Sequence, residues 1–169
     1  LSSKGQDFKG VLKVQDIVEN VTEQSEKLKE AGADLIVVLA HTGIGPENPE
    51  YGEKNVAYAL TKLDAIDAVL CGHEHNAFPS EDKSGAYYQL SGVDKETNLV
   101  NGTNLVMAED RGESVGVIDF TLELVDGEIE VVDRKSNLRR ATNKNTVEEE
   151  SIAHLYDELS EEMLEYTKS

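Results

Sequence analysis

Two apolar segments of the sequence each end at a histidine that lies close to a glycine. Residues 34–40 are followed by His41, and residues 67–71 are followed by Gly-His-Glu-His at 72–75. Their near-continuous aliphatic content predicts strands that are buried on both faces of a parallel sheet. Ligands of open α/β sheets bind at the carboxyl ends of the strands. This pattern therefore constrains the chain to an α/β fold with His41, His73 and His75 at that edge.

The elements around these strands follow a β–α–β order. The spacing of apolar residues predicts a helix over residues 16–31, which begins at a capping pair of Asp16 and Glu19. A loop over residues 42–52 separates the first strand from a second helix. The apolar face of that helix carries Val56, Ala59, Leu60 and Leu63. A β–α–β unit of this kind has a right-handed crossover and parallel strands.

The second half of the sequence is organised differently. Residues 77–98 are rich in turn formers, and we expect a long loop with a short extended piece over residues 87–90. Turns at Asn101-Gly102 and Asp126-Gly127 predict an antiparallel meander. Its strands are expected over residues 105–108, 115–124 and 128–133. A final helix is predicted from a second capping box at Thr146 to the end of the chain. Its apolar face carries Ile152, Leu155, Leu159, Met163 and Tyr166.

The composition excludes some partners. The formal net charge is −18, from 34 acidic and 16 basic residues, so the surface repels phosphate backbones and duplex nucleic acid is not an expected partner. A single nucleotide would need a locally positive centre, such as a metal pair, to draw it in. No stretch of the sequence approaches the roughly 20 apolar residues that a membrane span needs. The first residue is Leu1 rather than methionine, and we expect the chain to be cut from a longer one.

The histidines at the strand ends predict a metal site. In extended backbone, residues two apart project from the same face, so His73 and His75 would reach one locus while Glu74 points away to solvent. His41, at a neighbouring strand end, can join them. Imidazole is a common ligand of transition metals, and three imidazoles alone could hold a single zinc ion with an open position.

Other residues allow simpler interpretations. Cys71, the one cysteine, rules out an internal disulfide and is expected to be a small core residue. His154 flanks the apolar face of the last helix and is expected to be structural. Arg111 follows a strand, where it could meet a phosphate or form a surface salt bridge.

The motifs also resemble those of a known family. They are residues 32–43 with His41 and Gly43, residues 64–75 with the Gly-His-Glu-His sequence, Phe78-Pro79, residues 101–107 and residues 116–119. Together they resemble the calcineurin-like metallophosphoesterases. Within the 5′-nucleotidase family, the sequence is most similar to the bacterial 2′,3′-cyclic-nucleotide 2′-phosphodiesterase/3′-nucleotidases.

The resemblance implies a four-layer α/β/β/α sandwich that holds two divalent metal ions, which could be Mn, Zn, Fe or Mg. It implies that His41 and His73 bind one ion and His75 the other. Because 5′-nucleotidases often have glutamine at the last of these positions, His75 favours the cyclic-nucleotide branch. The upstream motifs of the family (Asp-x-His, Gly-Asp and Gly-Asn-His-Glu) are absent from the sequence. The bridging aspartate and the histidine that assists the leaving group are missing with them, so no catalytic residue is assigned.

We therefore expect residues 1–140 to be the C-terminal half of a catalytic domain and residues 141–169 to be a linker helix. The longer protein, called the parent here, is expected to hydrolyse 2′,3′-cyclic nucleotides and 3′-nucleotides, and the chain alone to be inactive. Its expected partners are the nucleotide substrate, the missing N-terminal half and a C-terminal nucleotide-binding domain. The resemblance also implies a bacterial protein that is secreted, attached to the cell wall or periplasmic.

Two alternatives stay open at this point. The parent could be a 5′-nucleotidase or a related hydrolase of phosphate or sulfur esters. It could also be a non-catalytic surface module that has kept the fold.

Overall fold

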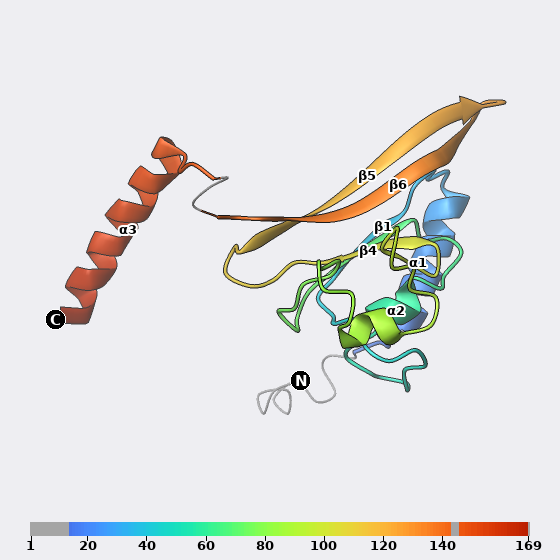
Figure 1. Ribbon diagram of the computed structural model, residues 1–169, viewed down its shortest axis with the longest axis horizontal. Coiled ribbons are helices and arrows are strands. Elements are labelled where there is room, and N and C mark those ends of the chain that lie inside the picture. The colour runs from blue at the N-terminus through green and yellow to red at the C-terminus, as the bar shows by residue number, and fades with distance from the viewer. Residues whose placement is uncertain (1–13, 143–145, 169) are drawn as a thin grey trace. The chain divides into compact units, whose positions relative to one another are not determined.

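The computed structural model describes residues 14–142 and 146–168, which fall into two compact units that divide between Arg139 and Arg140. The larger unit is a mixed α/β structure and the smaller one is built on a single helix (Figure 1). In chain order the elements are α1 (Ile17–Glu30), β1 (Val37–Ala40), α2 (Ala57–Leu60), β2 (Ala68–Cys71), the 3-10 helix η2 (Ala86–Gln89), β3 (Leu99–Val100), β4 (Thr103–Met107), β5 (Ser114–Val125), β6 (Glu128–Arg140) and α3 (Glu150–Lys168).

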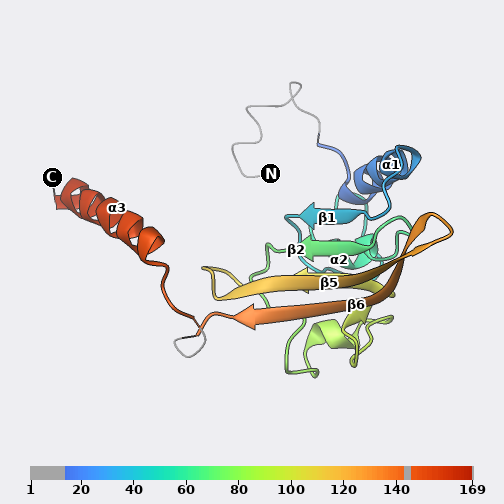
Figure 2. The ribbon, with the colours of Figure 1, turned by 90° about the horizontal axis from the view of Figure 1, so that it is seen from above.

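The main sheet has four strands in the order β1-β2-β4-β3. Strand β2 pairs parallel with both β1 and β4, which confirms the predicted β–α–β unit. The arrows of β1 and β2 accordingly run in the same direction in Figure 2. Strand β4 was expected in an antiparallel meander, and this expectation is wrong. The Asn101-Gly102 turn does join β4 to an antiparallel β3, but the other edge of β4 pairs with β2.

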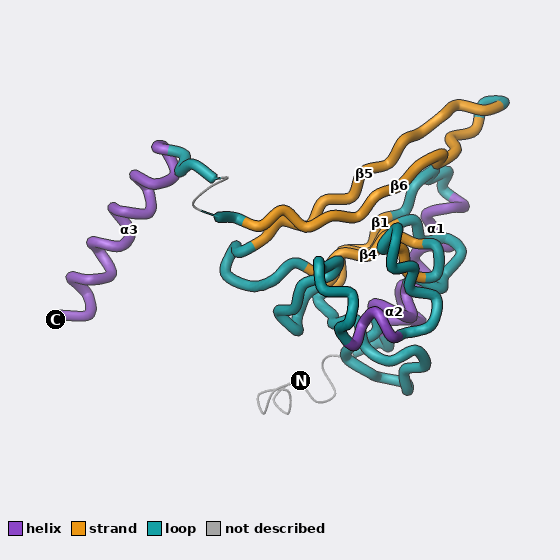
Figure 3. The backbone as a smooth tube through the Cα atoms, in the orientation of Figure 1, coloured by secondary structure: helices purple, strands orange, loops and turns teal. Residues whose placement is uncertain are grey.

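Strands β5 and β6 pair across the Asp126-Gly127 turn, as predicted, but they form a sheet of their own rather than a meander with β4, and both are longer than expected (Figure 3). Asp126 and Gly127 adopt positive φ angles of 54° and 93°, which suit a two-residue hairpin turn. The hairpin contacts β4, since Asn104 Nδ2 donates a 2.9 Å hydrogen bond to Ser136 Oγ. At Gly116 an added Cβ would lie 3.2 Å from Val106 Cγ2, so the glycine allows close packing of the two sheets.

The two faces of β1 have different environments. Val38 and Ala40 pack against the core that also contains residues of α1 and α2. Val37 and Leu39 point to the opposite face and are 48% and 80% exposed. The prediction of a strand buried on both faces is therefore wrong for β1. This strand lies at the edge of the sheet, and none of the described residues buries Leu39.

Helix α1 begins as the capping pair predicts. Asp16 Oδ1 accepts the amide of Glu19 at 3.0 Å, which satisfies one of the free amides of the first turn. The second oxygen, Oδ2, accepts the amide of Gly52 at 2.7 Å and so joins the helix to the loop after β1. These two backbone hydrogen bonds, with that of Gly52 the stronger, lower the pKa of the Asp16 carboxyl.

Two short elements differ from expectation. The second helix is a single turn, α2, and it continues through tighter turns to Leu63. The piece expected to be extended near Tyr88 is instead the 3-10 helix η2. Burial of the Tyr88 ring explains this, because it packs 5.1 Å from the Phe78 ring while its hydroxyl accepts the amide of Ser80.

The smaller unit contains helix α3. The helix begins at Glu150 rather than at the predicted cap, and the Thr146 hydroxyl donates to the carbonyl of Thr142 instead. Most of the predicted apolar face is exposed, including Ile152 at 65% and Met163 at 67%, and the side chain of Leu155 lies outside the described part. In the described part of the chain, no helix is both long and apolar enough to span a bilayer.

Replacing Asp16 tests the cap. We expect Asp16→Ala to lower the free energy of unfolding by about 1–2 kcal/mol, because it frees two backbone amides, while Glu26→Ala on the exposed side of α1 changes little. The lowered pKa means that the Asp16 contribution is complete above the unfolded pKa of about 3.9. It is lost as pH falls through the lower folded value. Urea unfolding at pH 7 and pH 3 should show a difference between wild type and Asp16→Ala that shrinks at the lower pH.

Candidate metal centre

The pairing of β1 with β2 brings two of the predicted ligands together. Ala40 lies opposite Cys71 in the parallel register, so both strands end at the same level. The amide of Gly72 then donates to the carbonyl of Thr42 at 3.0 Å, which continues the pairing past the strands. His41 and His73 consequently leave the sheet from neighbouring positions.

The two imidazoles approach each other closely. Nδ1 of His73 is 3.4 Å from Nε2 of His41, and the rings meet edge to face with centroids 5.2 Å apart. Two nitrogens bound at 2.0–2.1 Å to a tetrahedral zinc ion are about 3.4 Å apart. Both side chains are exposed, so an ion can reach them from solvent. The separation of the two nitrogens therefore matches that of two ligands in one coordination shell; without an ion, the same contact can be a hydrogen bond between the rings.

The third predicted ligand lies apart from this pair. Nδ1 of His75 is 3.6 Å from Asp110 Oδ2, and the His75 side chain is 62% exposed. Within residues 14–142 and 146–168, no three His, Cys, Asp or Glu side chains form one group that could hold a metal. The structure thus unites His41 with His73 and places His75 beside a carboxylate instead.

The backbone explains why His75 diverges. His73 and His75 have positive φ angles of 72° and 57°, in the left-handed region. The expectation that these residues are extended and share one face is therefore wrong. The chain turns sharply at the end of β2, and the turn sends the two rings to different places.

The same turn directs Glu74 inward, which corrects the expectation that it faces solvent. Its carboxylate is half-buried and accepts hydrogen bonds from the Ile44 amide at 3.2 Å, Asn55 Nδ2 at 3.2 Å and the Tyr87 hydroxyl at 3.0 Å. Burial raises the pKa of Tyr87, and the Glu74 hydrogen bond adds to this, so the hydroxyl keeps the proton that it donates.

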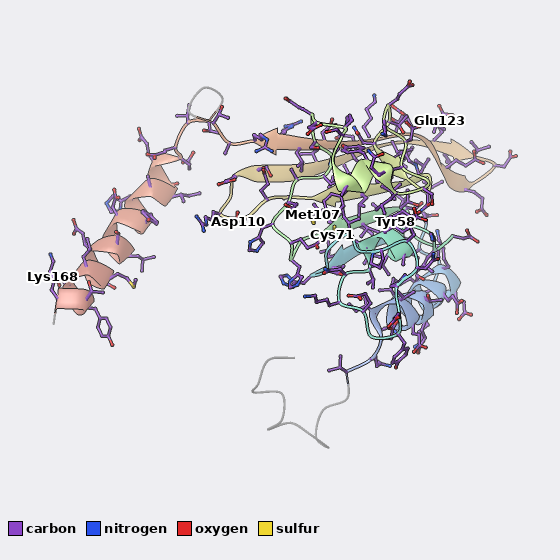
Figure 4. All side chains as sticks on the ribbon, turned by 60° about the horizontal axis from the view of Figure 1, so that its bottom comes forward. Tyr58, Cys71, Met107, Asp110, Glu123 and Lys168 are labelled. Atoms are coloured by element: carbon purple, nitrogen blue, oxygen red, sulfur yellow. The ribbon has the colours of Figure 1, made fainter. Side chains whose placement is uncertain are left out.

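Asp110 is a residue of this region that the sequence analysis missed. It lies in the loop beyond Met107, the last residue of β4 (Figure 4). Because β4 is parallel to β2, its carboxyl end reaches the same edge of the sheet as the histidines. The apolar residues just before Asp110 are the signal that could have found it. If they had been predicted as a strand of the parallel sheet, Asp110 would have been expected at the same edge as the histidines. Arg111, the weak candidate for phosphate binding, is 85% exposed and forms an ion pair with Asp110 at 3.2 Å.

Two other residues singled out from the sequence have simpler environments. Cys71 packs against the core, as predicted, and burial followed by the nearby charge of Glu74 raises the pKa of its thiol to about 12. His154 lies on α3, 75% exposed and 3.5 Å from Glu158, one turn further along that helix. It is therefore a surface residue rather than a part of a buried structural contact.

Known proteins resemble this chain over most of its length. The family model of the calcineurin-like phosphoesterases matches residues 4–77. The trifunctional nucleotide phosphoesterase protein YfkN of Bacillus subtilis is 35% identical over 95% of this chain and 11% of the relative. The 2′,3′-cyclic-nucleotide 2′-phosphodiesterase/3′-nucleotidase of Yersinia enterocolitica is 31% identical over 81% of this chain and 20% of the relative.

A solved structure is similar as well. The crystal structure of the calcineurin-like phosphoesterase YfkN from Bacillus subtilis superimposes with a TM-score of 0.84 at 34% identity, covering 98% of this chain and 50% of that one. The chain spans no more than a fifth of the length of these curated relatives and half of the solved structure.

The raised pKa of Cys71 can be tested by alkylation. Near pH 8.5 an ordinary free thiol is about half ionised, whereas a thiol with a pKa of about 12 is a thiolate in less than about one molecule in a thousand. We expect iodoacetamide to modify native Cys71 at least a hundredfold more slowly than the urea-unfolded chain, measured by mass spectrometry. Equal rates would show that the thiol is accessible and ionises normally.

Proposed function

Because the chain is part of a calcineurin-like phosphoesterase domain, we propose that its parent hydrolyses 2′,3′-cyclic nucleotides and then the resulting 3′-nucleotides. The observation that carries the proposal is the 3.4 Å separation of His41 Nε2 and His73 Nδ1 at the carboxyl edge of the parallel sheet. The names of the relatives support the choice of nucleotide esters as substrates.

The family implies divalent metal ions, and we assign two of them to the parent. His41 and His73 would hold one. His75 would serve the other through Nε2, since Asp110 lies against Nδ1 and would orient the ring from behind. A bound divalent ion supplies Lewis-acid stabilisation of the charge that develops on the phosphate.

The remaining ligands would come from the rest of the domain. A bridging carboxylate is not among the side chains grouped with His41 and His73 in the described residues. Among the described residues, β1 pairs on one side only and Leu39 is exposed, which would give further strands of the same domain a place to pair and pack. On this proposal residues 1–140 are the second half of the catalytic domain, and residues 141–169 lead toward a nucleotide-binding domain.

The assignment of His41 and His73 to one ion predicts how substitutions change the Mn²⁺ affinity of the parent. We expect His41→Ala and His73→Ala each to weaken the binding of Mn²⁺ at one site by at least about tenfold, because each removes a ligand of the same ion. The double variant should bind this ion more weakly than either single variant, because both imidazole ligands are then missing. Isothermal titration calorimetry measures the affinities, and His154→Ala on α3 is the matched control. Unchanged binding in both single variants would contradict the assignment.

The substrate assignment is tested on the parent with Mn²⁺ and three nucleotides. We expect release of phosphate from 2′,3′-cyclic AMP and 3′-AMP to exceed that from 5′-AMP, and His73→Ala to abolish it. Hydrolysis of 5′-AMP alone would identify a 5′-nucleotidase. A folded, metal-loaded parent that hydrolyses none of the three would support the alternative of a non-catalytic surface module.

A further inference from the structure

Glu74 connects three segments of the chain at the candidate metal centre. Its Oε2 accepts from the Ile44 amide and the Tyr87 hydroxyl, and its Oε1 accepts from Asn55 Nδ2. Ile44 and Asn55 lie in the loop between β1 and α2, and Tyr87 lies in η2. Glu74 itself lies between His73 and His75 in the turn after β2, so its hydrogen bonds join the loop that carries one histidine to the turn that carries the others.

The loop after β1 can transmit a constraint from Ile44 back to His41. Thr42, between them, is fully buried, and its Oγ1 donates to the Lys54 carbonyl at 2.6 Å and accepts the Val56 amide at 2.9 Å. The carbonyl of Thr42 also accepts the amide of Gly72. With Thr42 fixed in this way and Ile44 held by Glu74, the backbone on the carboxyl side of His41 has little freedom.

Gly43 leaves the space that the Glu74 side chain occupies. A Cβ at position 43 would lie only 2.3–2.5 Å from Oε2, Cδ and Cγ of Glu74, which is closer than any real contact. Gly43 is not among the glycines with a positive φ, so the need for glycine here is steric rather than conformational. The inward carboxylate therefore occupies the space that any other residue at position 43 would fill.

The turn that carries Glu74 has an unfavourable backbone. Both neighbours of Glu74 are histidines in the left-handed region, which residues with a Cβ adopt only when surrounding contacts hold them there. The three hydrogen bonds of the Glu74 carboxylate are such contacts.

We propose that Glu74 is a positioning residue that sets the separation of His41 and His73, with Gly43 providing the space for its carboxylate. The inference rests on the proposed function, in which these two histidines hold one ion. Glu74 acts through the backbone at Ile44 and through the turn that contains His73, and it is assigned no contact with the ion.

Four variants of the parent test this role: Glu74→Ala, Glu74→Gln, Gly43→Ala and the double variant Gly43→Ala/Glu74→Ala. The matched control is Glu81→Ala, an exposed glutamate in the next loop. Two readouts are needed. The first is the affinity and the visible absorption spectrum of bound Co²⁺, which report the ligand geometry. The second is hydrogen exchange of the Ile44 amide in the metal-free protein, which reports the Glu74 hydrogen bond without any metal.

We expect Glu74→Ala to weaken Co²⁺ binding about 10–100-fold, to change the spectrum and to speed exchange of the Ile44 amide. Glu74→Gln should weaken Co²⁺ binding less, because the carbonyl oxygen of glutamine can still accept hydrogen bonds from the Ile44 amide and the Tyr87 hydroxyl. Gly43→Ala alone should weaken Co²⁺ binding, because its new Cβ meets the Glu74 carboxylate. In the Glu74→Ala background this carboxylate is gone, so Gly43→Ala should weaken binding little further.

The outcomes separate the two proposals. Wild-type affinity and spectrum in both Glu74 variants would overturn the positioning role, as would a Gly43→Ala effect that is equally large with and without Glu74. If wild-type parent binds no Co²⁺, the proposed function fails instead, and slow Ile44 exchange that speeds up in Glu74→Gln and Glu74→Ala would still support the connection between the loops. Should Glu74→Ala not fold, the Glu74→Gln spectrum and exchange rate decide the matter alone.

Discussion

The parallel pairing of β1 with β2 is the constraint on which the candidate site depends. Its register places Ala40 opposite Cys71, so the residues that follow leave the sheet at the same level and His41 meets His73. A slip of one residue would turn every side chain of β1 to the other face and bury the residues that are now exposed. The hydrogen bond from Gly72 to Thr42 makes such a slip harder, because it fixes the backbone beyond the last strand residues.

The parallel pairing of β1 and β2 could be predicted from the sequence, because few folds are compatible with its pattern of segments. Two aliphatic segments separated by a helical one leave a parallel β–α–β unit as the main solution, and the carboxyl ends of parallel strands meet at one edge. That topology predicts that His41 and His73 lie at the same edge of the sheet, and the register of the two strands then brings them into contact. Helix α1 was predictable for a local reason, since the Asp16 cap is encoded within four residues.

The rest of the site depends on contacts between distant parts of the chain, which local patterns do not contain. Glu74 points inward because its partners Ile44 and Tyr87, 30 and 13 residues away, receive its carboxylate there. An i, i+2 spacing does not reveal that His73 and His75 adopt left-handed backbone. Likewise, the Asn101-Gly102 turn predicts one neighbour of β4 and says nothing about the other. Because β4 was assigned to a meander, the sequence analysis did not place Asp110 at the edge of the sheet where the histidines lie.

Under the proposed function, the negative charge of the chain explains why neutral histidines are suitable ligands for the metal ion. A nucleotide phosphate is repelled by a surface with a formal net charge of −18, so its binding needs a local centre that stays positive. A carboxylate ligand cancels one unit of the charge of a divalent ion, whereas a neutral imidazole cancels none. Two histidines at one ion would therefore leave more of its positive charge to attract phosphate than two carboxylates would. The carboxylate of Glu74 has a different part under the proposal: its oxygens accept hydrogen bonds from amide and hydroxyl donors of the protein, and these bonds order the backbone that carries the histidines.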